Sequence, residues 1–146
     1  MSKYFLAKSE PSSYSIDDLV EDGVTWWDGV HNYQAINVIK SWNVGDKVFF
    51  YRSLKEPAVV GLMEVISNPI FDTLDKQKIS WKAQCKILEV FEEPVKLKEI
   101  KSSGRFDSFI LVRNSRLSVM ACTQEFVSYV IDRTKPVYSL SKKSKI

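Results

Sequence analysis

The alternation of hydrophobic and polar residues predicts four strands. In residues 79–87 every second residue is apolar and the residues between are polar, which is typical of a strand with one buried face. Residues 46–53 and 57–66 are rich in β-branched and aromatic residues, and the three residues that separate them predict a hairpin. Residues 3–10 predict an entry strand, which ends at a proline that cannot donate a ladder hydrogen bond.

A second set of segments shows helical signals. Residues 15–23 begin with a serine and an aspartate three positions later and end at a glycine, the start and stop signals of a short helix. In residues 32–42 apolar side chains recur at i, i+4 and i+7. Residues 123–132 predict a closing helix capped by a threonine, with apolar residues along one side. Pro94 ends the strand that precedes it, and residues 97–100 predict one helical turn.

The order of these elements indicates the fold class. Strands and helices do not alternate regularly, which argues against a doubly wound parallel sheet. An α+β fold with a small curved or barrel-like mixed sheet and helices around it fits the order better. Residues 26–37, "WWDGVHNYQAIN", read as an aromatic-rich loop that leads into a helix.

Length and charge set the organisation of the chain. At 146 residues it has the length of one domain, which we expect over residues 1–133. Residues 134–146 contain four lysines and no acid and show no helical periodicity, so we expect a flexible tail, either simply solvated or a weak phosphate-seeking arm. No apolar run is long enough for a bilayer span, and the first ten residues do not resemble a signal peptide. We therefore expect a cytoplasmic monomer with no membrane partner.

The usual catalytic motifs are missing from the sequence. His31 is the only histidine, no Gly-x-Ser-x-Gly segment is present, and no glycine-rich phosphate loop occurs. The two cysteines are not in a Cys-x-x-Cys pair, so we expect neither a metal site nor a cofactor. Acids at positions 10, 17, 18 and 28 leave a carboxylate pair open. We expect no enzyme activity.

Binding chemistry is better represented than catalysis. Aromatic side chains can grip flat ligands, and polar side chains can read the edge of an unpaired base. Candidate rings are Trp26, Trp27, Tyr33, Tyr51 and Trp81. Candidate edge readers are Ser9, Asp28, Asn32, Gln34 and Ser53, and candidate phosphate contacts are Lys8, His31, Arg52, Arg113 and Arg116. Several of these tryptophans are also good core residues, and both arginines near residue 115 also fit as plain surface charges.

Five motifs resemble those of one family, the EVE domain, in order and spacing. They are "KSEP" at 8–11, "WDGVHNYQA" at 27–35, "VGDKVFFYRS" at 44–53, "VVGLMEV" at 59–65 and "LVRNSRLSV" at 111–119. The resemblance covers residues 3–132. It implies a PUA-like fold, a curved β pseudo-barrel flanked by helices, that reads a modified or flipped-out base in DNA or RNA.

The same resemblance implies a set of site residues. The base-binding residues would be Lys8, Ser9, Glu10, Trp27, Asp28, Gly29, Val30, His31, Asn32, Tyr33, Tyr51, Arg52, Ser53, Leu117 and Ser118, with Arg113 and Arg116 on phosphates. Among the aromatic residues of this segment we expect Trp26, which is outside the set, to pack inward, Trp27 to begin the turn that shapes the pocket, and Tyr33 to stand at its wall.

Three positions depart from the family pattern. His31 and Ile36 stand where the family usually has arginine, and Arg52 stands where histidine is common. Because phosphates dominate the affinity of most nucleic-acid binders, losing two arginines predicts weaker or redistributed phosphate contact. Two alternatives remain open: an enzyme that acts on nucleotides through Glu10 or Asp28, and a module that binds a small molecule or protein.

Overall fold

The computed structural model describes residues 2–134 and 136–139. These residues form one eight-stranded sheet with the order β2-β6-β4-β3-β1-β7, to which β5 and β8 add by pairing with β6. The strands are β1 (Tyr4–Ser9), β2 (Val24–Trp27), β3 (Lys47–Arg52), β4 (Ala58–Val65), β5 (Ile70–Phe71), β6 (Trp81–Lys96), β7 (Val119–Ala121) and β8 (Pro136–Ser139). The helices are α1 (Ile16–Asp22), α2 (Tyr33–Lys40), α3 (Leu97–Ser102), α4 (Ile110–Arg113) and α5 (Gln124–Arg133).

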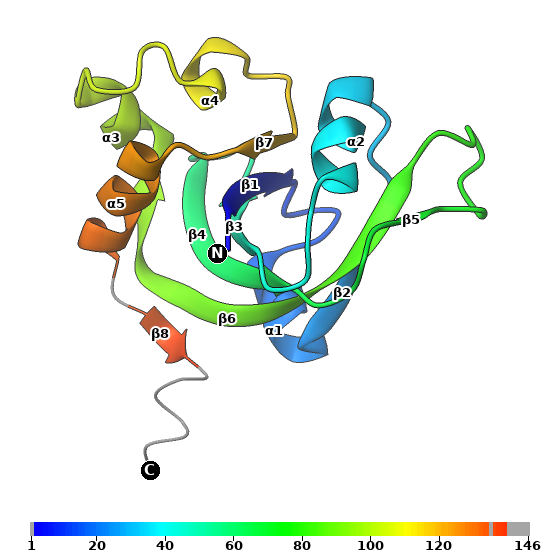
Figure 1. The fold of residues 1–146 in the computed structure, drawn as a ribbon. Helices are drawn as coiled ribbons and strands as arrows, with labels where there is room; N and C mark the ends of the chain where they lie inside the picture. Colours follow the sequence, from blue (N-terminus) through cyan, green and yellow to red (C-terminus); the bar gives the residue numbers. More distant parts are fainter. Residues whose placement is uncertain (1, 135, 140–146) are drawn as a thin grey trace.

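The sheet curls into an open barrel with helices around it (Figure 1). Strands β1 and β3 are parallel, and the other pairs are antiparallel. The long strand β6 sweeps beneath the barrel, with α3 and α5 on one side and α2 on the other (Figure 1). This architecture confirms the predicted α+β class and the curved mixed sheet.

The predicted helix starts are confirmed in detail. Ser15 and Asp18 form a reciprocal capping box at the start of α1, and Gly23 ends that helix with φ +76°. Side-chain oxygens of Asn32 and Thr123 accept the N–H groups of the third residues after them, at the starts of α2 and α5. Each cap satisfies an N–H group that the helix itself leaves unpaired.

Strand β6 is longer than the alternating pattern predicts. The prediction ended the strand before Pro94, but β6 continues through this proline to Lys96. Its pairing with β4 is irregular between Val90 and Val95. A proline is tolerated in a strand at such a bulge, because no ladder hydrogen bond needs its missing N–H group. The bulge also bends β6, which helps the sheet to curl.

Four short strands, β2, β5, β7 and β8, were not predicted. Residues 24–27 form β2, so the interpretation of the "WW" pair as part of a loop is wrong. This strand has only four residues and owes its conformation to pairing with β6, where Trp26 lies opposite Gln84. Strand β5 has only two residues. None of the four is long enough to show a period-2 pattern by itself.

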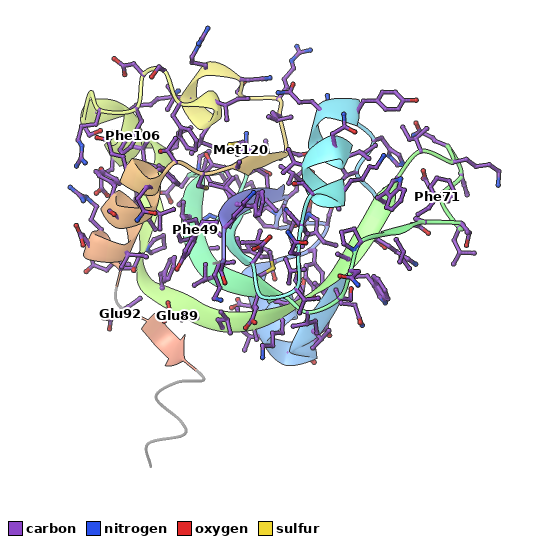
Figure 2. The ribbon with its side chains drawn as sticks, viewed as in Figure 1. Phe49, Phe71, Glu89, Glu92, Phe106 and Met120 are labelled. Carbon is purple, nitrogen blue, oxygen red and sulfur yellow. The ribbon has the colours of Figure 1, made fainter. Side chains whose placement is uncertain are left out.

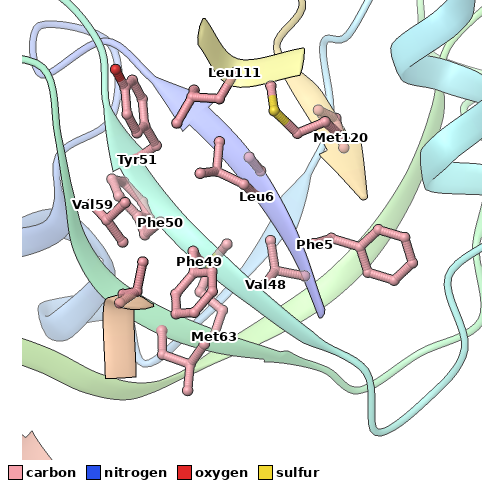
Figure 3. Packing of buried hydrophobic residues seen from close by; sticks show 14 of the residues in the cluster. Phe5, Leu6, Val48, Phe49, Phe50, Tyr51, Val59, Met63, Leu111 and Met120 are labelled. Atoms are coloured by element: carbon pink, nitrogen blue, oxygen red, sulfur yellow. The ribbon is translucent and has the colours of Figure 1, made fainter. Parts of the chain in front are cut away.

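The barrel interior is the hydrophobic core. The Phe49 ring on β3 lies 5.6 Å from the ring of Tyr4 and 6.2 Å from that of Phe126, measured between centroids. It stands near the centre of the molecule, between the sheet and α5 (Figure 2). Leu6 and Met63, from β1 and β4, are fully buried beside it (Figure 3). The curled sheet therefore closes on its own apolar face.

Gly61→Ala is expected to destabilise the fold strongly. A Cβ atom at Gly61 would lie 2.7 Å from the carbonyl oxygen of Glu89 and 2.9 Å from the Ile16 side chain. Because backbone on β6 must move to relieve the clash, we expect a loss of about 3 kcal/mol in the free energy of unfolding. Denaturant unfolding measures it. Gly104→Ala meets no such clash, because no atom lies within 4 Å, but its φ of +70° costs an alanine about 1–2 kcal/mol. A loss at Gly61 no larger than the loss at Gly104 would contradict this explanation.

The segment after residue 133 is described only in part. Residues 136–139 form β8 on the edge of β6, although the sequence predicts a flexible tail from residue 134. The lysines at 142, 143 and 145 lie outside the described residues, and the tail prediction stays a prediction there. In the described part of the chain, no helix is long and apolar enough to cross a membrane.

Candidate functional site

A cavity of about 540 Å³ opens between the end of β1 and the turn that joins β2 to α2. This volume lies within the roughly 300–1,000 Å³ that is typical of small-molecule sites. Aromatic, hydroxyl, carboxylate and amide groups share its wall. The lining residues are Lys8, Ser9, Ser13, Tyr14, Thr25, Trp26, Trp27, Asp28, Gly29, Val30, His31, Asn32 and Ser118.

The structure brings together most of the predicted site residues. Nine of them line this cavity: Lys8, Ser9, Trp27, Asp28, Gly29, Val30, His31, Asn32 and Ser118. Eight do not line it: Glu10, Tyr33, Tyr51, Arg52, Ser53, Arg113, Arg116 and Leu117. Sequence reasoning missed Ser13, Tyr14 and Thr25, which carry no motif and reach the cavity only because β1, α1 and β2 meet there.

The two tryptophans have the reverse of their expected burial. Trp27 is 7% exposed, and its ring meets Phe50 edge-on at 5.6 Å. Trp26, expected to pack inward, is 38% exposed, and the Lys82 ammonium lies 4.8 Å from its ring centroid. Successive residues of a strand point to opposite faces, so only one of the pair can enter the core. Trp27 therefore fixes the inner wall of the cavity, and Trp26 contributes to its rim.

The turn after β2 presents two polar side chains to the cavity. Gly29 has φ +71°, a left-handed conformation that favours glycine and that turns the chain toward α2. Asn32 caps α2 through its side-chain oxygen, which leaves its amide N–H group without a partner among the described residues. Asp28 is exposed and likewise has no hydrogen-bond partner in the described part of the chain. The turn therefore offers one free acceptor and one free donor.

Lys8 is held by the segment before β7 and lies against the ring of Tyr51 on β3. The Lys8 ammonium donates to the carbonyl oxygen of Ser115 at 3.0 Å and lies 5.5 Å from the Tyr51 ring centroid. Its partial burial lowers the pKa of Lys8. Burial also raises the pKa of the Tyr51 phenol to about 12. Tyr51 thus contacts Lys8 from the side of β3. It was predicted to bind the base, but it does not line this cavity.

The other predicted residues at the end of β3 have structural roles. The Arg52 guanidinium donates twice to the carbonyl oxygen of Glu56, at 3.2 and 2.9 Å, and so closes the turn between β3 and β4. The Ser53 N–H group donates to the carbonyl oxygen of Ser9 at 3.0 Å. The bond from Ser53 holds the backbone of Ser9, and neither Arg52 nor Ser53 lines the cavity.

The remaining predicted residues lie around the site or in the core. Leu117 is buried at 2% exposure, one residue before the cavity-lining Ser118. Arg113 and Arg116 are exposed on the segment before β7. Tyr33 is 67% exposed at the first residue of α2 and does not form a cavity wall. Glu10 is exposed, and its carbonyl oxygen accepts the N–H groups of the turn that follows β1.

His31 is held by an acid from a distant segment. Its Nε2 atom lies 2.6 Å from Oδ1 of Asp75, in the loop between β5 and β6. Oδ2 of Asp75 also accepts the N–H groups of Ile79 and Ser80, both at 3.0 Å. Hydrogen bonding from His31 and then from these two backbone groups holds the pKa of Asp75 well below its usual range, against the opposing effect of burial. Ile36, the other departure from the family pattern, is 3% exposed and belongs to the core.

Asp75→Ala is expected to loosen the loop between β5 and β6. A depressed pKa means that the ionised carboxylate stabilises the fold above its unfolded pKa, about 3.9, and that this stabilisation is lost as the pH falls further. At pH 6 the variant should be less stable than the parent, and the amides of Ile79 and Ser80 should exchange faster with solvent. The stability gap should narrow below about pH 4. A gap that is constant with pH, or one also produced by Asp107→Ala at an exposed acid, would contradict this explanation.

The described residues hold no group of three or more His, Cys, Asp or Glu side chains that could bind a metal ion. Both cysteines are free, and burial raises the pKa of the Cys85 thiol to about 12. The cavity wall itself supplies hydrogen-bonding side chains and aromatic rings.

Comparison with known proteins identifies relatives over almost the whole chain. The EVE domain family model matches residues 3–133. Human thymocyte nuclear protein 1 is 30% identical over an alignment that covers 90% of this chain and 73% of that protein. A hypothetical protein from Leishmania major superposes with a TM-score of 0.83 at 33% identity, covering 90% of this chain and 94% of that one. The human THYN1 protein in complex with DNA containing 5-methylcytosine superposes with a TM-score of 0.80 at 27% identity, covering 90% and 96%.

Proposed function

Because the chain belongs to the EVE domain family, we propose that it binds nucleic acid and holds one modified base, of the 5-methylcytosine type, in the cavity beside β1 and β2. The observation that carries this proposal is the pairing of a free acceptor, Asp28, with a free donor, Asn32, on a wall that also contains the Trp27 ring. The relative in complex with DNA containing 5-methylcytosine supports the class of ligand.

The polar groups of the turn match the edge of a cytosine. Its N4 amino group is a donor, and carboxylates accept hydrogen bonds from this group. Its ring nitrogen and O2 are acceptors, which suit the side-chain amide of Asn32. The oxygen of this amide is occupied by the N–H group of Ala35, so its NH₂ group is aimed away from the helix. A base edge in the cavity would satisfy both Asp28 and Asn32.

The apolar part of the wall suits a flat ring that carries a methyl group. Trp27 is held edge-on against Phe50, so its position does not depend on a ligand, and Val30 lies beside it in the cavity lining. Aromatic and aliphatic side chains are the usual contacts of a methyl group at position 5 of a pyrimidine. The cavity therefore offers a reason to prefer a methylated base over a plain one.

We assign phosphate contact to two exposed arginines, Arg113 and Arg116. Arg116 lies two residues before Ser118, which lines the cavity, and Arg113 lies at the end of α4. The Lys8 ammonium contacts the carbonyl oxygen of Ser115, next to Arg116, and so links this segment to the cavity. The backbone of a bound strand would run along this edge, and its contribution to affinity would fall as salt rises.

A binding role fits the site better than catalysis. Of the two candidate acids, Glu10 does not line the cavity, so Asp28 is the one carboxylate in its described lining and has no second carboxylate there for paired acid–base chemistry. His31 is engaged by the Asp75 carboxylate at 2.6 Å. We therefore propose that its role is to fix the position of a loop.

Equilibrium binding to matched oligonucleotides tests the proposed function. Short labelled strands and duplexes with one central cytosine or 5-methylcytosine are titrated with the protein at low and at physiological salt. Burying one methyl group is worth about 0.8 kcal/mol, so the methylated base should bind about fourfold more tightly at both salt concentrations. Equal affinity for both bases, together with binding that vanishes as salt rises, would reduce the activity to that of a basic surface.

A further inference from the structure

The loop between β5 and β6, residues 72–80, carries the most exposed large apolar side chain among the described residues. Leu74 is 84% exposed. Lys76 and Lys78 follow it, and both are exposed without an ion-pair partner in the described part of the chain. Figure 1 shows that this loop projects away from the barrel, beyond α2. A leucine in such a position gains nothing from the folded protein itself.

Hydrogen bonds hold this loop in one shape. Asp72 is only 8% exposed, and its side chain accepts the N–H group of Leu74 at 3.1 Å. Its carbonyl oxygen accepts the N–H group of Asp75 at 3.1 Å. Asp75 in turn accepts the N–H groups of Ile79 and Ser80. Leu74 is therefore presented by an ordered turn.

The base of the hairpin is also rigid. Phe71 on β5 and Trp81 on β6 are paired across the strands, and their rings meet at a centroid distance of 6.2 Å. The Lys40 ammonium of α2 lies 4.9 Å from the Trp81 ring centroid. Phe71 stands at the foot of the projecting loop (Figure 2). The loop is thus braced both by its own strands and by α2.

A direct contact connects the loop to the candidate base site. His31 lines the cavity, and its ring bonds to Asp75, the residue next to Leu74. The side chain of Asp75 is 7% exposed, so this contact is largely shielded from water. The exposed leucine is therefore held at a fixed place beside the cavity.

We propose that Leu74 is the wedge that takes the place of the extruded base in duplex DNA, while Lys76 and Lys78 contact the phosphates on either side. This inference rests on the proposed function, and it specifies a duplex as the substrate. A base that leaves a duplex opens an apolar gap in the stack, and the unstacking costs a few kcal/mol per step. Leucine is among the side chains that proteins insert between base steps. Basic residues beside it match the charge of the backbone that flanks the gap.

The wedge should affect affinity only for a duplex, where the extruded base leaves a gap in the base stack. A modified base in a single strand is already unpaired, so its entry into the cavity leaves no duplex gap. Leu74 should therefore contribute to the binding of duplexes and not to that of single strands. A leucine that serves the fold, or the cavity itself, would affect both substrates equally.

Leu74→Ser tests the inference with Ile131→Ser as its matched control. Ile131 is 48% exposed on α5, a helix that lies on the other side of the barrel from the loop (Figure 1). Leu74→Ser should bind a duplex with one central 5-methylcytosine about tenfold more weakly than the parent. Its affinity for the corresponding single strand should match that of the parent. Ile131→Ser should bind both substrates as the parent does.

A fluorescence probe reports the wedge independently of affinity. With 2-aminopurine in place of an adenine next to the guanine that pairs with the modified base, the parent should change the emission at saturation, because insertion alters the stacking of the opposite strand. Leu74→Ser at saturation should change it less. Equal losses for duplex and single strand, or no loss for either, would overturn the wedge and leave the base site intact. A parent protein that binds only single strands would overturn it too, whereas a parent that ignores the methyl group in both substrates would overturn the proposed function itself.

Discussion

Trp27→Ala is expected to cost about 3–5 kcal/mol of the free energy of unfolding, as large-to-small changes of a buried tryptophan do. The side chain is 7% exposed and is packed on Phe50, so its removal leaves a void between the barrel and the cavity. Because small domains have only about 5–15 kcal/mol of stability in total, this is a large share. Denaturant unfolding measures the loss.

The same substitution should also weaken the binding of a modified base. The inner wall of the cavity disappears with the indole ring, and contact with one aromatic ring is worth about 1–3 kcal/mol per base. We therefore expect at least about fivefold weaker binding of an oligonucleotide with 5-methylcytosine, measured at a temperature where the variant is still folded. Phe126→Ala is the control, because this buried ring belongs to α5 and does not line the cavity. If Phe126→Ala weakened binding as much, the loss would reflect stability and not the cavity wall.

Asp28→Asn is expected to lower affinity by about 10- to 100-fold with no loss of stability. The carboxylate is exposed and has no hydrogen-bond partner in the described part of the chain, so the fold does not depend on it. A hydrogen bond to a charged group is worth about 1.5–3 kcal/mol, and an asparagine offers a weaker acceptor in the same place. Fluorescence anisotropy with a labelled modified strand measures the change.

The charge of Asp28 must be separated from its position. Asp107→Asn removes the same charge from an exposed acid that does not line the cavity. If phosphates alone drove binding, removing either acid would strengthen it slightly, because each acid repels the DNA backbone. Weaker binding for Asp28→Asn and unchanged or stronger binding for Asp107→Asn would identify Asp28 as a contact of the base.

Local signals in the sequence predicted much of the fold. Capping residues such as Ser15 and Asn32 act within a few positions of themselves, and the structure confirms the helices that they begin. The alternation in residues 79–87 predicted the first half of β6 for the same reason. The second half was missed because Pro94 argues locally against a strand, whereas the bulge that accommodates it depends on β4.

The predicted site residues also fall into two groups: those that a local segment places together, and those whose position depends on the whole fold. Asp28, Gly29 and Asn32 share one turn, so the sequence places them together whatever the fold. Tyr51 and Arg52 belong to a motif of the family, but the sequence does not show that they pair with Lys8 and Ser9 of β1 without lining the cavity themselves. The contact between His31 and Asp75 joins residues 44 positions apart, and no local pattern announces it. A contact of this kind depends on the tertiary fold, so the sequence alone did not predict it.

Chemical-shift mapping tests the central claim that the modified base enters the cavity beside β1 and β2. The protein labelled with ¹⁵N is titrated with a short oligonucleotide that carries one 5-methylcytosine, and then with its unmodified counterpart. We predict that the amides of residues 26–32 and of Lys8, Ser9 and Ser118 differ most between the two titrations. A smaller cavity lies elsewhere, lined by residues within 105–110 and 121–125. Differences centred there, or no difference between the two oligonucleotides, would contradict the claim.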